Sequence, residues 1–292
     1  MISYDFKAIG TAWHIDIYQE LGAAREAELF SRIRARIEAF EQAYSRFRDD
    51  SIVGRIARAA GEYELPSDAE RMLALYRDLY DRTGGFFTPL IGGLLVDAGY
   101  DARYSLKPQR DMRAIPAWDD SIEYRCPILQ VKKPVQLDFG AAGKGYLIDL
   151  VGELMHSEGV DGYCIDAGGD ILHKGRTPIR IGLEDPQDPE SVVGIYELKD
   201  MSICGSAGNR RAWGDFTHIM NPKTLSSPKE ISAVWVVAQS ALVADALTTC
   251  LFFVPAHALA DAYAFEYLIV RADRSIERSR GFAAELFDTS GV

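Results

Sequence analysis

The stretch "QLDFGAAGKGYLID", residues 136–149, places three glycines and a lysine ahead of an amphipathic run. Small residues at the start of a helix let a ligand approach the backbone, and Lys144 adds a positive charge beside main-chain N–H groups that the helix leaves unpaired. The alternative is a tight strand-to-helix turn whose glycines serve packing alone. The stretch therefore predicts a helix from Tyr146 to Glu158 and leaves the role of its glycines open.

Two common nucleotide loops do not match this stretch. A Walker loop needs a glycine where Asp138 stands and a Ser or Thr where Gly145 stands, and the glycine order also differs from a dinucleotide-binding GxGxxG. A carboxylate beside a phosphate is unfavourable, so we expect Asp138 to bind something else, such as a ring N–H or the shell of a cation.

Composition limits the partners of the chain. The 292 residues include 32 basic and 43 acidic side chains, a net charge of −11. This balance argues against nucleic acid or an anionic membrane surface as a partner. A bound polyphosphate must then be met locally, by backbone amides, a lysine or a cation. No linker-like stretch divides the chain, so we expect one domain over residues 1–292.

The chain shows no signal for export or membrane insertion. Its first twenty residues lack a basic segment followed by an apolar one, and the longest apolar run near the end, "LTTCLFFV", is too short to span a bilayer. We expect a cytoplasmic protein, or a periplasmic one if an export signal has been removed. The four cysteines form no CxxC pair and are interpreted as buried thiols.

Hydrophobic periodicity predicts a mixed α+β fold. Helices are expected at 22–44, after a Ser67–Glu70 capping box, and at 240–253 with Ser240 as N-cap. Strands are expected in the following segments: 8–18, both arms of "GYCIDAGGDILHKG", "IRIGLED", "VGIYEL", "SAVWVVAQ" and "EYLIVRAD". Because these strands follow one another through turns as often as through helices, we expect largely antiparallel sheets with packed helices.

Two further groups carry chemistry. Asp245 and Thr249 are four residues apart in a predicted helix, so they lie on one face and offer the hard oxygen ligands that Mg²⁺ prefers. The alternative is a pair that caps locally or faces solvent. His218 stands before Asn-Pro in a turn-like setting, where it is placed to act as a base or to hold a ligand.

Seven short segments share their order with the motifs of one protein family. They are "AIGT" (8–11), "SRFRDDS" (45–51), "TGGFFTPLIGGLL" (83–95), "LDFGAAGKGYLID" (137–149), "DAGGDI" (166–171), "HIMNP" (218–222) and "ADALTT" (244–249). Together they resemble the ApbE-type flavin transferases, which move FMN from FAD onto a Thr or Ser hydroxyl of a target protein. The resemblance covers nearly the whole chain and implies an ApbE-like, T-fold-related α+β fold.

The resemblance also implies a role for individual residues. Those in contact with FAD would be Phe47 near the isoalloxazine, Phe86, Phe87 and Thr88 along the nucleotide, Asp138, Lys144, and Ile219 through its backbone. Those around Mg²⁺ would be Asp245, Thr249 and the main-chain carbonyl of Ala141. His218 is the candidate catalytic base. Several positions depart from the family pattern: Ile9 stands where Met is usual, Thr88 where Asp is usual and Leu225 where Gly is usual, and "CGSAGN" replaces a Thr-Ser-Gly segment.

The implied function is a Mg²⁺-dependent FAD:protein FMN transferase that releases AMP. Its partners would be FAD and an acceptor protein with a Ser/Thr-Gly-Ala-Ser/Thr motif. The same apparatus would act as an FAD pyrophosphatase if water took the place of the hydroxyl, and a non-catalytic flavin-binding protein on this scaffold is the remaining alternative.

Overall fold

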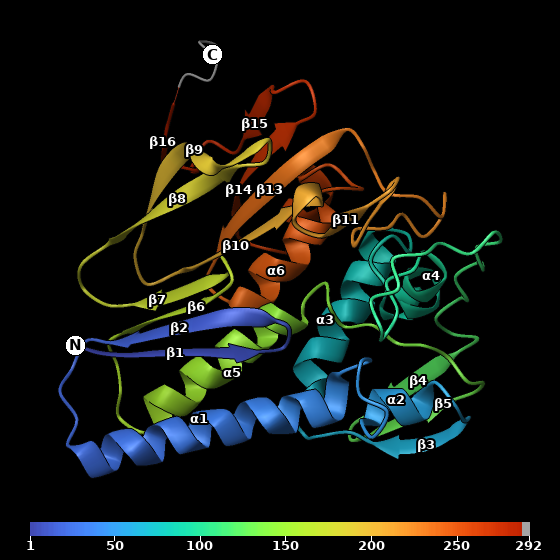
Figure 1. The fold of residues 1–292 in the computed structure, drawn as a ribbon, viewed down its shortest axis with the longest axis horizontal. Helices are drawn as coiled ribbons and strands as arrows, with labels where there is room; N and C mark the ends of the chain where they lie inside the picture. Colours follow the sequence, from blue (N-terminus) through green and yellow to red (C-terminus); the bar gives the residue numbers. More distant parts are fainter. Residues whose placement is uncertain (288–292) are drawn as a thin grey trace.

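The structure is a computed structural model that describes residues 1–287 (Figure 1). Its largest element is an eight-stranded sheet in the order β1-β2-β6-β7-β10-β13-β14-β15, in which every neighbouring pair is antiparallel. The strands are β1 (Ile2–Ala8), β2 (Thr11–Ile17), β6 (Tyr163–Ala167), β7 (Ile171–Lys174), β10 (Ser202–Ala207), β13 (Ile231–Ala238), β14 (Glu266–Arg271) and β15 (Ile276–Arg278). The predicted α+β class with antiparallel sheets is confirmed.

A smaller sheet packs on one face of the large one. It has the order β16-β9-β8, formed by β8 (Ile179–Asp185), β9 (Asp188–Leu198) and β16 (Ala284–Leu286). Apolar side chains from both sheets meet between them, among them Leu183, Trp235 and Phe282. We call this pair of sheets the sandwich. Burial of apolar surface stabilises it by roughly 25 cal/mol for each Å² removed from water.

Helices cover the opposite face of the large sheet. In Figure 1, α5 and α6 lie against it, α1 runs along its lower edge and α3 stands beside it. The bounds are α1 (Ala23–Tyr44), α3 (Ala69–Arg82), α5 (Gly143–Ser157) and α6 (Ala241–Cys250). The amphipathic α1 buries Leu29, Ile33 and Ile37 on the face that the spacing predicts.

Helix ends agree with the sequence in one case and differ in another. The Ser240 hydroxyl accepts a hydrogen bond from the Val243 N–H and so caps α6 as predicted. The capping box predicted at Ser67 does not form: the N-cap of α3 is Asp68, and it has no side-chain cap within the described chain. The Asp68 carboxylate instead accepts hydrogen bonds from Arg36 and from the hydroxyl of Tyr44, so tertiary partners decide how α3 begins.

The shorter elements connect these helices and sheets. They are α2 (Ile52–Ile56), β3 (Gly61–Glu64), η1 (Pro89–Ile91), α4 (Gly92–Asp97), β4 (Ile122–Arg125), β5 (Ile128–Val131), η2 (Gly208–Arg211), β11 (Ala212–Trp213), β12 (Phe216–Thr217) and α7 (His257–Ala260). Strands β3, β5 and β4 form a sheet of their own, and β11 pairs with β12. In the part of the chain that the structure describes, no helix has the length and apolar character that crossing a membrane requires.

Candidate active site

The glycine loop meets α6 where α5 begins. The Gly145 N–H donates a hydrogen bond of 2.8 Å to the Asp245 carboxylate, which is 100 residues away in the sequence. A Cβ atom at Gly145 would overlap the carbonyl oxygen of Ala241 and lie 2.7 Å from the Cβ of Asp245. This glycine therefore allows the two helices to approach closely, and the approach brings the loop to the predicted metal ligand.

Asp245 lies at this helix junction, and the other two predicted metal-binding positions lie on the segments that meet there. Asp245 is 5% exposed, and burial raises the pKa of its carboxyl while the Lys144 charge opposes the rise. Thr249 lies one helical turn further along α6, and Ala141 lies in the loop just before α5. Within residues 1–287 no three His, Cys, Asp or Glu side chains form a metal-binding group. A cation here would be bound by one carboxylate, one hydroxyl and one carbonyl, a hard oxygen set that fits Mg²⁺.

Lys144 is held by a residue that the sequence reading quoted only as part of a motif. Its ammonium forms an ion pair with Asp170, whose side chain is 1% exposed. The other oxygen of Asp170 accepts a hydrogen bond from the Gly205 N–H at 3.1 Å. Asp170 therefore fixes the Lys144 amine at the junction and ties it to strand β10.

Asp138 is paired with Arg46, which sequence reasoning missed. The two form an ion pair, with side-chain exposures of 2% for Arg46 and 11% for Asp138. Asp138 also accepts a hydrogen bond of 2.7 Å from the Gly140 N–H, which shapes the loop. Arg46 stands next to Phe47 in "SRFRDDS", but its partner is 92 residues away, so no local pattern reveals the pair. We call Arg46, Asp138, Lys144, Asp170 and Asp245 the charged junction.

Phe47 belongs to an exposed aromatic group above Arg46. Its ring stacks on Tyr104 with centroids 5.4 Å apart and meets the edge of Tyr100 at 5.7 Å. The Arg46 guanidinium lies 4.1 Å from the centre of the Phe47 ring. Phe47 is 38% exposed and Tyr104 is 51% exposed. A flat aromatic ligand would find stacking surface here, and the place of the isoalloxazine beside Phe47 stays a prediction.

The predicted nucleotide-contact segment divides between surface and core. Phe86 is partly exposed, stacks on Phe253 at 5.6 Å and has the Lys223 ammonium 4.0 Å above its ring. Phe87 is 1% exposed and Thr88 is 5% exposed, and the Thr88 hydroxyl caps η1. The contacts predicted for Phe87 and Thr88 can therefore involve their main chain, whereas Phe86 alone of these three offers its side chain.

His218 follows β12 on a loop at the junction. Its N–H donates to the carbonyl of Arg211 at 3.1 Å. Burial, and then the Arg211 charge, lower the pKa of His218 to about 4, while the Asp138 carboxylate acts in the opposite direction. The imidazole is therefore neutral at pH 7 and has a lone pair that can accept a proton. The neighbouring Ile219 donates its N–H to the Thr217 hydroxyl and accepts from the same hydroxyl, both at 3.1 Å.

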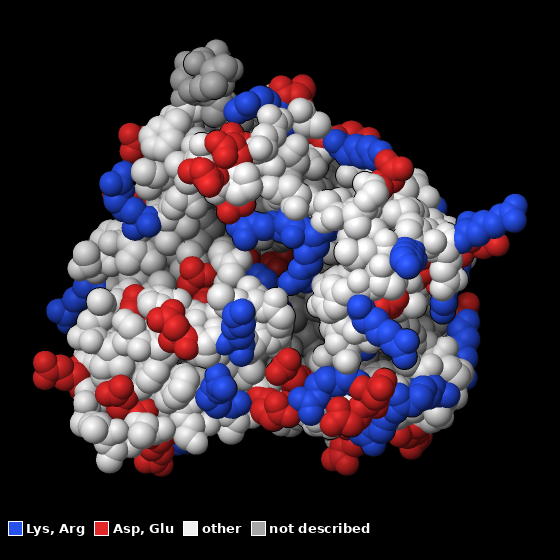
Figure 2. All heavy atoms as spheres, in the orientation of Figure 1, with Lys and Arg blue, Asp and Glu red and all other residues white. Residues whose placement is uncertain are grey.

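Three buried polar atoms near Asp138 lack a hydrogen-bond partner among the described residues: Arg46 Nη2, Tyr76 Oη and His218 Nδ1. The Asp138 carboxylate acts on the pKa of both Tyr76 and His218, so the charge of this residue reaches both side chains. Buried polar groups are normally hydrogen-bonded, so a cluster of exceptions indicates a site prepared for a polar ligand. Figure 2 shows a hollow near the centre of this face, with Lys and Arg side chains at its rim.

The fold is similar to that of solved flavin transferase structures. The flavin transferase ApbE from Vibrio cholerae superposes with a TM-score of 0.80 at 22% identity, covering 96% of this chain and 97% of that one. The ApbE protein of Thermotoga maritima gives a TM-score of 0.83 at 22% identity over the same shares. These likenesses establish the architecture.

The sequence comparison then gives the family. The ApbE family profile matches residues 9–268, and the chain belongs to the ApbE family. A Treponema pallidum protein named FAD:protein FMN transferase is 26% identical over 84% of this chain and 76% of its own length. A Rhodobacter capsulatus protein of the same name is 27% identical over 67% of this chain, and this match spans 40% of the Rhodobacter protein.

Proposed function

We propose that this protein is a Mg²⁺-dependent FAD:protein FMN transferase that joins FMN to a Ser or Thr hydroxyl and releases AMP. The observation that carries the proposal is the Gly145–Asp245 hydrogen bond, because it brings the glycine loop and the predicted metal ligand into one site. Membership of the ApbE family, whose curated relatives bear that transferase name, makes the chain an enzyme of the transferase class.

The charged junction suits a diphosphate ligand despite the overall charge of −11. Lys144 supplies one fixed positive charge, and the start of α5 supplies backbone N–H groups. Ala141, Asp245 and Thr249 would hold Mg²⁺, which when bound draws negative charge from the phosphate oxygens. Asp170 restrains Lys144 before the ligand arrives, so that little ordering is needed on binding.

Residues on the other side of Asp138 would hold the flavin. Phe47 and Tyr104 provide a stacking surface, and Arg46 Nη2 offers an N–H donor to a carbonyl of the ring. Arg46 also keeps Asp138 paired, so the carboxylate is compatible with a nearby phosphate. This arrangement resolves the objection to a lone carboxylate in a phosphate-binding loop.

The transfer itself needs a proton acceptor beside the incoming hydroxyl. His218 takes that proton as the hydroxyl oxygen forms a bond to the FMN phosphorus and the bond from that phosphorus to the AMP oxygen breaks. The lowered pKa keeps His218 unprotonated at pH 7 and therefore ready to accept. His218→Ala should reduce the rate by about 10²–10⁴-fold, while FAD affinity stays within a factor of about two.

Product analysis separates the three functions. The protein is incubated with FAD, Mg²⁺ and a peptide containing Asp-x-x-Ser-Gly-Ala-Thr, which is the longer form of the acceptor motif that the family resemblance implies. We expect the peptide to gain the mass of one FMN with release of AMP. AMP and free FMN without peptide labelling would instead identify an FAD pyrophosphatase, and intact bound FAD would identify a flavin-binding protein.

A further inference from the structure

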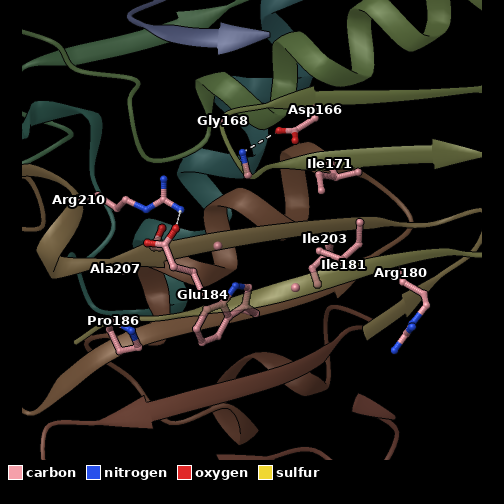
Figure 3. Close-up of a pocket in the computed structure, with 15 residues that line it drawn as sticks. Asp166, Gly168, Ile171, Arg180, Ile181, Glu184, Pro186, Ile203, Ala207 and Arg210 are labelled. Atoms are coloured by element: carbon pink, nitrogen blue, oxygen red, sulfur yellow. Dashed lines mark hydrogen bonds and ion pairs between the residues drawn. The ribbon is translucent and has the colours of Figure 1, made fainter. Parts of the chain in front are cut away.

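A cavity of about 310 Å³ opens within the sandwich, next to the candidate active site (Figure 3). It lies where β8 of the small sheet passes the β6–β7 turn and the second half of β10. The residues predicted for flavin or metal binding do not line it. It is therefore a space apart from the predicted flavin and metal residues.

Two strand edges border the cavity. β7 pairs with β10 at Ser202 and Ile203, while β10 continues to Ala207 with β13 as its partner on the other side. β8 is the outer strand of its sheet. The lining also includes the glycines Gly168, Gly169, Gly182 and Gly205. Strand edges with exposed backbone and few side chains are the surface to which an extended peptide adds as a further strand.

Three contacts connect this cavity with the active site. The Ser206 hydroxyl lies 2.8 Å from that of Thr248, which is next to Thr249 on α6. The Gly205 N–H donates to Asp170, the partner of Lys144. Arg210 precedes Arg211, whose carbonyl accepts from the N–H of His218. A segment that adds to this part of β10 therefore lies along residues in direct contact with the neighbour of Thr249 and with the partner of Lys144.

Of the two arginines that line the cavity, one is paired closely with an acidic residue and the other is not. Figure 3 shows Arg210 and Glu184 pointing toward each other, and they form an ion pair of 2.8 Å. Arg180 has Glu285 as its nearest acidic partner at 3.9 Å, and both side chains are more than 60% exposed, with values of 64% and 70%. Such an exposed and distant pair contributes little. The Arg180 charge is thus available to an acidic residue of an incoming chain.

We infer that this cavity receives the acceptor protein as an extended segment that adds to β10, with an acidic residue of the segment paired to Arg180. The inference rests on the proposed function, because it names the place of that reaction's second substrate. It assigns the recognition of the acceptor to strand β10 and to Arg180, apart from the FAD site.

Binding of a fluorescein-labelled peptide containing Asp-x-x-Ser-Gly-Ala-Thr tests the inference. Fluorescence anisotropy is measured with FAD present and Mg²⁺ removed, so that no turnover occurs. Arg180→Glu should weaken peptide binding by about five-fold, since an exposed pair is replaced by a repulsion. Arg176→Glu is the matched control: Arg176 is exposed, does not line the cavity and undergoes the same change of charge. A peptide with Lys in place of Asp should bind Arg180→Glu better than it binds the wild type.

Backbone pairing is tested with the same peptide. Methylation of every second amide nitrogen should abolish binding, and methylation of the remaining amide nitrogens should leave binding nearly unchanged. The reason is that alternate N–H groups of a strand face the same neighbouring strand. Equal binding by Arg180→Glu and Arg176→Glu, or equal effects of all methylations, would overturn the inference.

The two proposals fail in different ways. If the wild type binds the peptide with this pattern but releases free FMN and AMP, the acceptor site is supported and the transferase assignment is wrong. If the wild type labels the peptide, and Arg180→Glu labels it at the same rate at low peptide concentration, the transferase assignment is supported and the proposed acceptor site is wrong.

Discussion

The inside of the sandwich and the charged junction are both buried, but they contain opposite kinds of side chain. Between the two sheets, Leu183 and Phe282 are at most 1% exposed. In the charged junction, the side chains of Arg46 and Asp170 are 2% and 1% exposed, and Asp245 is 5% exposed. Apolar burial stabilises a fold directly, whereas a buried ion pair often contributes no more than a well-packed apolar pair of the same size.

The difference assigns separate tasks to the two regions. The sandwich stabilises the chain, and the charged junction holds groups that folding alone does not require. Each buried charge of the junction has a partner on a distant segment, so the positions of all five side chains are fixed before a ligand binds. Substitutions should therefore separate activity from stability, and the following predictions use that separation.

The largest expected effect is on activity, and two buried aspartates of the same helix pair provide the comparison. Asp245→Asn should reduce turnover by about 10²–10³-fold, the usual result of removing one strong electrostatic contact from a phosphoryl-transfer site. Asp149 is the matched control, because its carboxylate accepts from the N–H groups of Ala241 and Leu242 and so caps α6. Asp149→Asn should lower the free energy of unfolding while FMN transfer stays within about two-fold. Equal turnover in the two variants would remove Asp245 from the metal site.

The opposite result is expected in the sandwich. Leu183 is fully buried between the sheets, so Leu183→Ala should lower the free energy of unfolding by about 2–5 kcal/mol through lost burial and a residual cavity. Urea denaturation gives this value. Titration with FAD, without denaturant and at a temperature where the variant is folded, should give an unchanged dissociation constant. A large loss of FAD affinity would show that the two regions are coupled.

The sequence predicted which motifs meet at the charged junction better than it predicted the ion-pair partners of the residues in those motifs. Gly145 and Asp245 lie in motifs that the sequence reading singled out, and the structure brings them together. The glycine loop combines the two interpretations left open above. Gly145 serves helix packing, and Lys144 supplies a positive charge at the same loop. Arg46 was missed because its role depends on an ion pair across 92 residues, and no local spacing encodes such a contact.

Local rules failed where tertiary contacts or paired edges decide the conformation. The strand predicted at 8–18 exists as β2, but its hairpin partner β1 was missed, although ISYDFKA alternates apolar and polar residues as a half-buried strand does. The two strands turn at Ile9 and Gly10, with φ angles of 44° and 76°. A β-branched residue with positive φ is uncommon, so its sequence gives no turn signal. The predictions of a single domain over 1–292 and of the roles of individual site residues stay predictions.

The pH dependence of stability tests the unusual setting of His218. Its pKa falls from 6.5 to about 4 on folding, so the unfolded chain binds a proton more readily than the folded one. Stability is therefore present above pH 6.5 and is lost as the pH falls toward 4, by up to about 3 kcal/mol for this group. His218→Asn should flatten the curve of unfolding free energy against pH in that window and leave its slope above pH 7 unchanged. Parallel curves for the two proteins would show that the ring is solvated.

The smallest expected effect concerns the loop that carries His218. Leu225 has a φ angle of 57°, in the left-handed region where the family's usual glycine is free of strain. Leu225→Gly and Leu225→Ala remove the same packing against the hydrophobic cluster that contains Trp213 and Met220, but alanine keeps the strained backbone. Leu225→Gly should therefore be more stable than Leu225→Ala by about 1 kcal/mol in urea denaturation. If alanine is equal or better, the loop relaxes without strain, and the rigidity ascribed to the charged junction does not extend to the loop that holds its base.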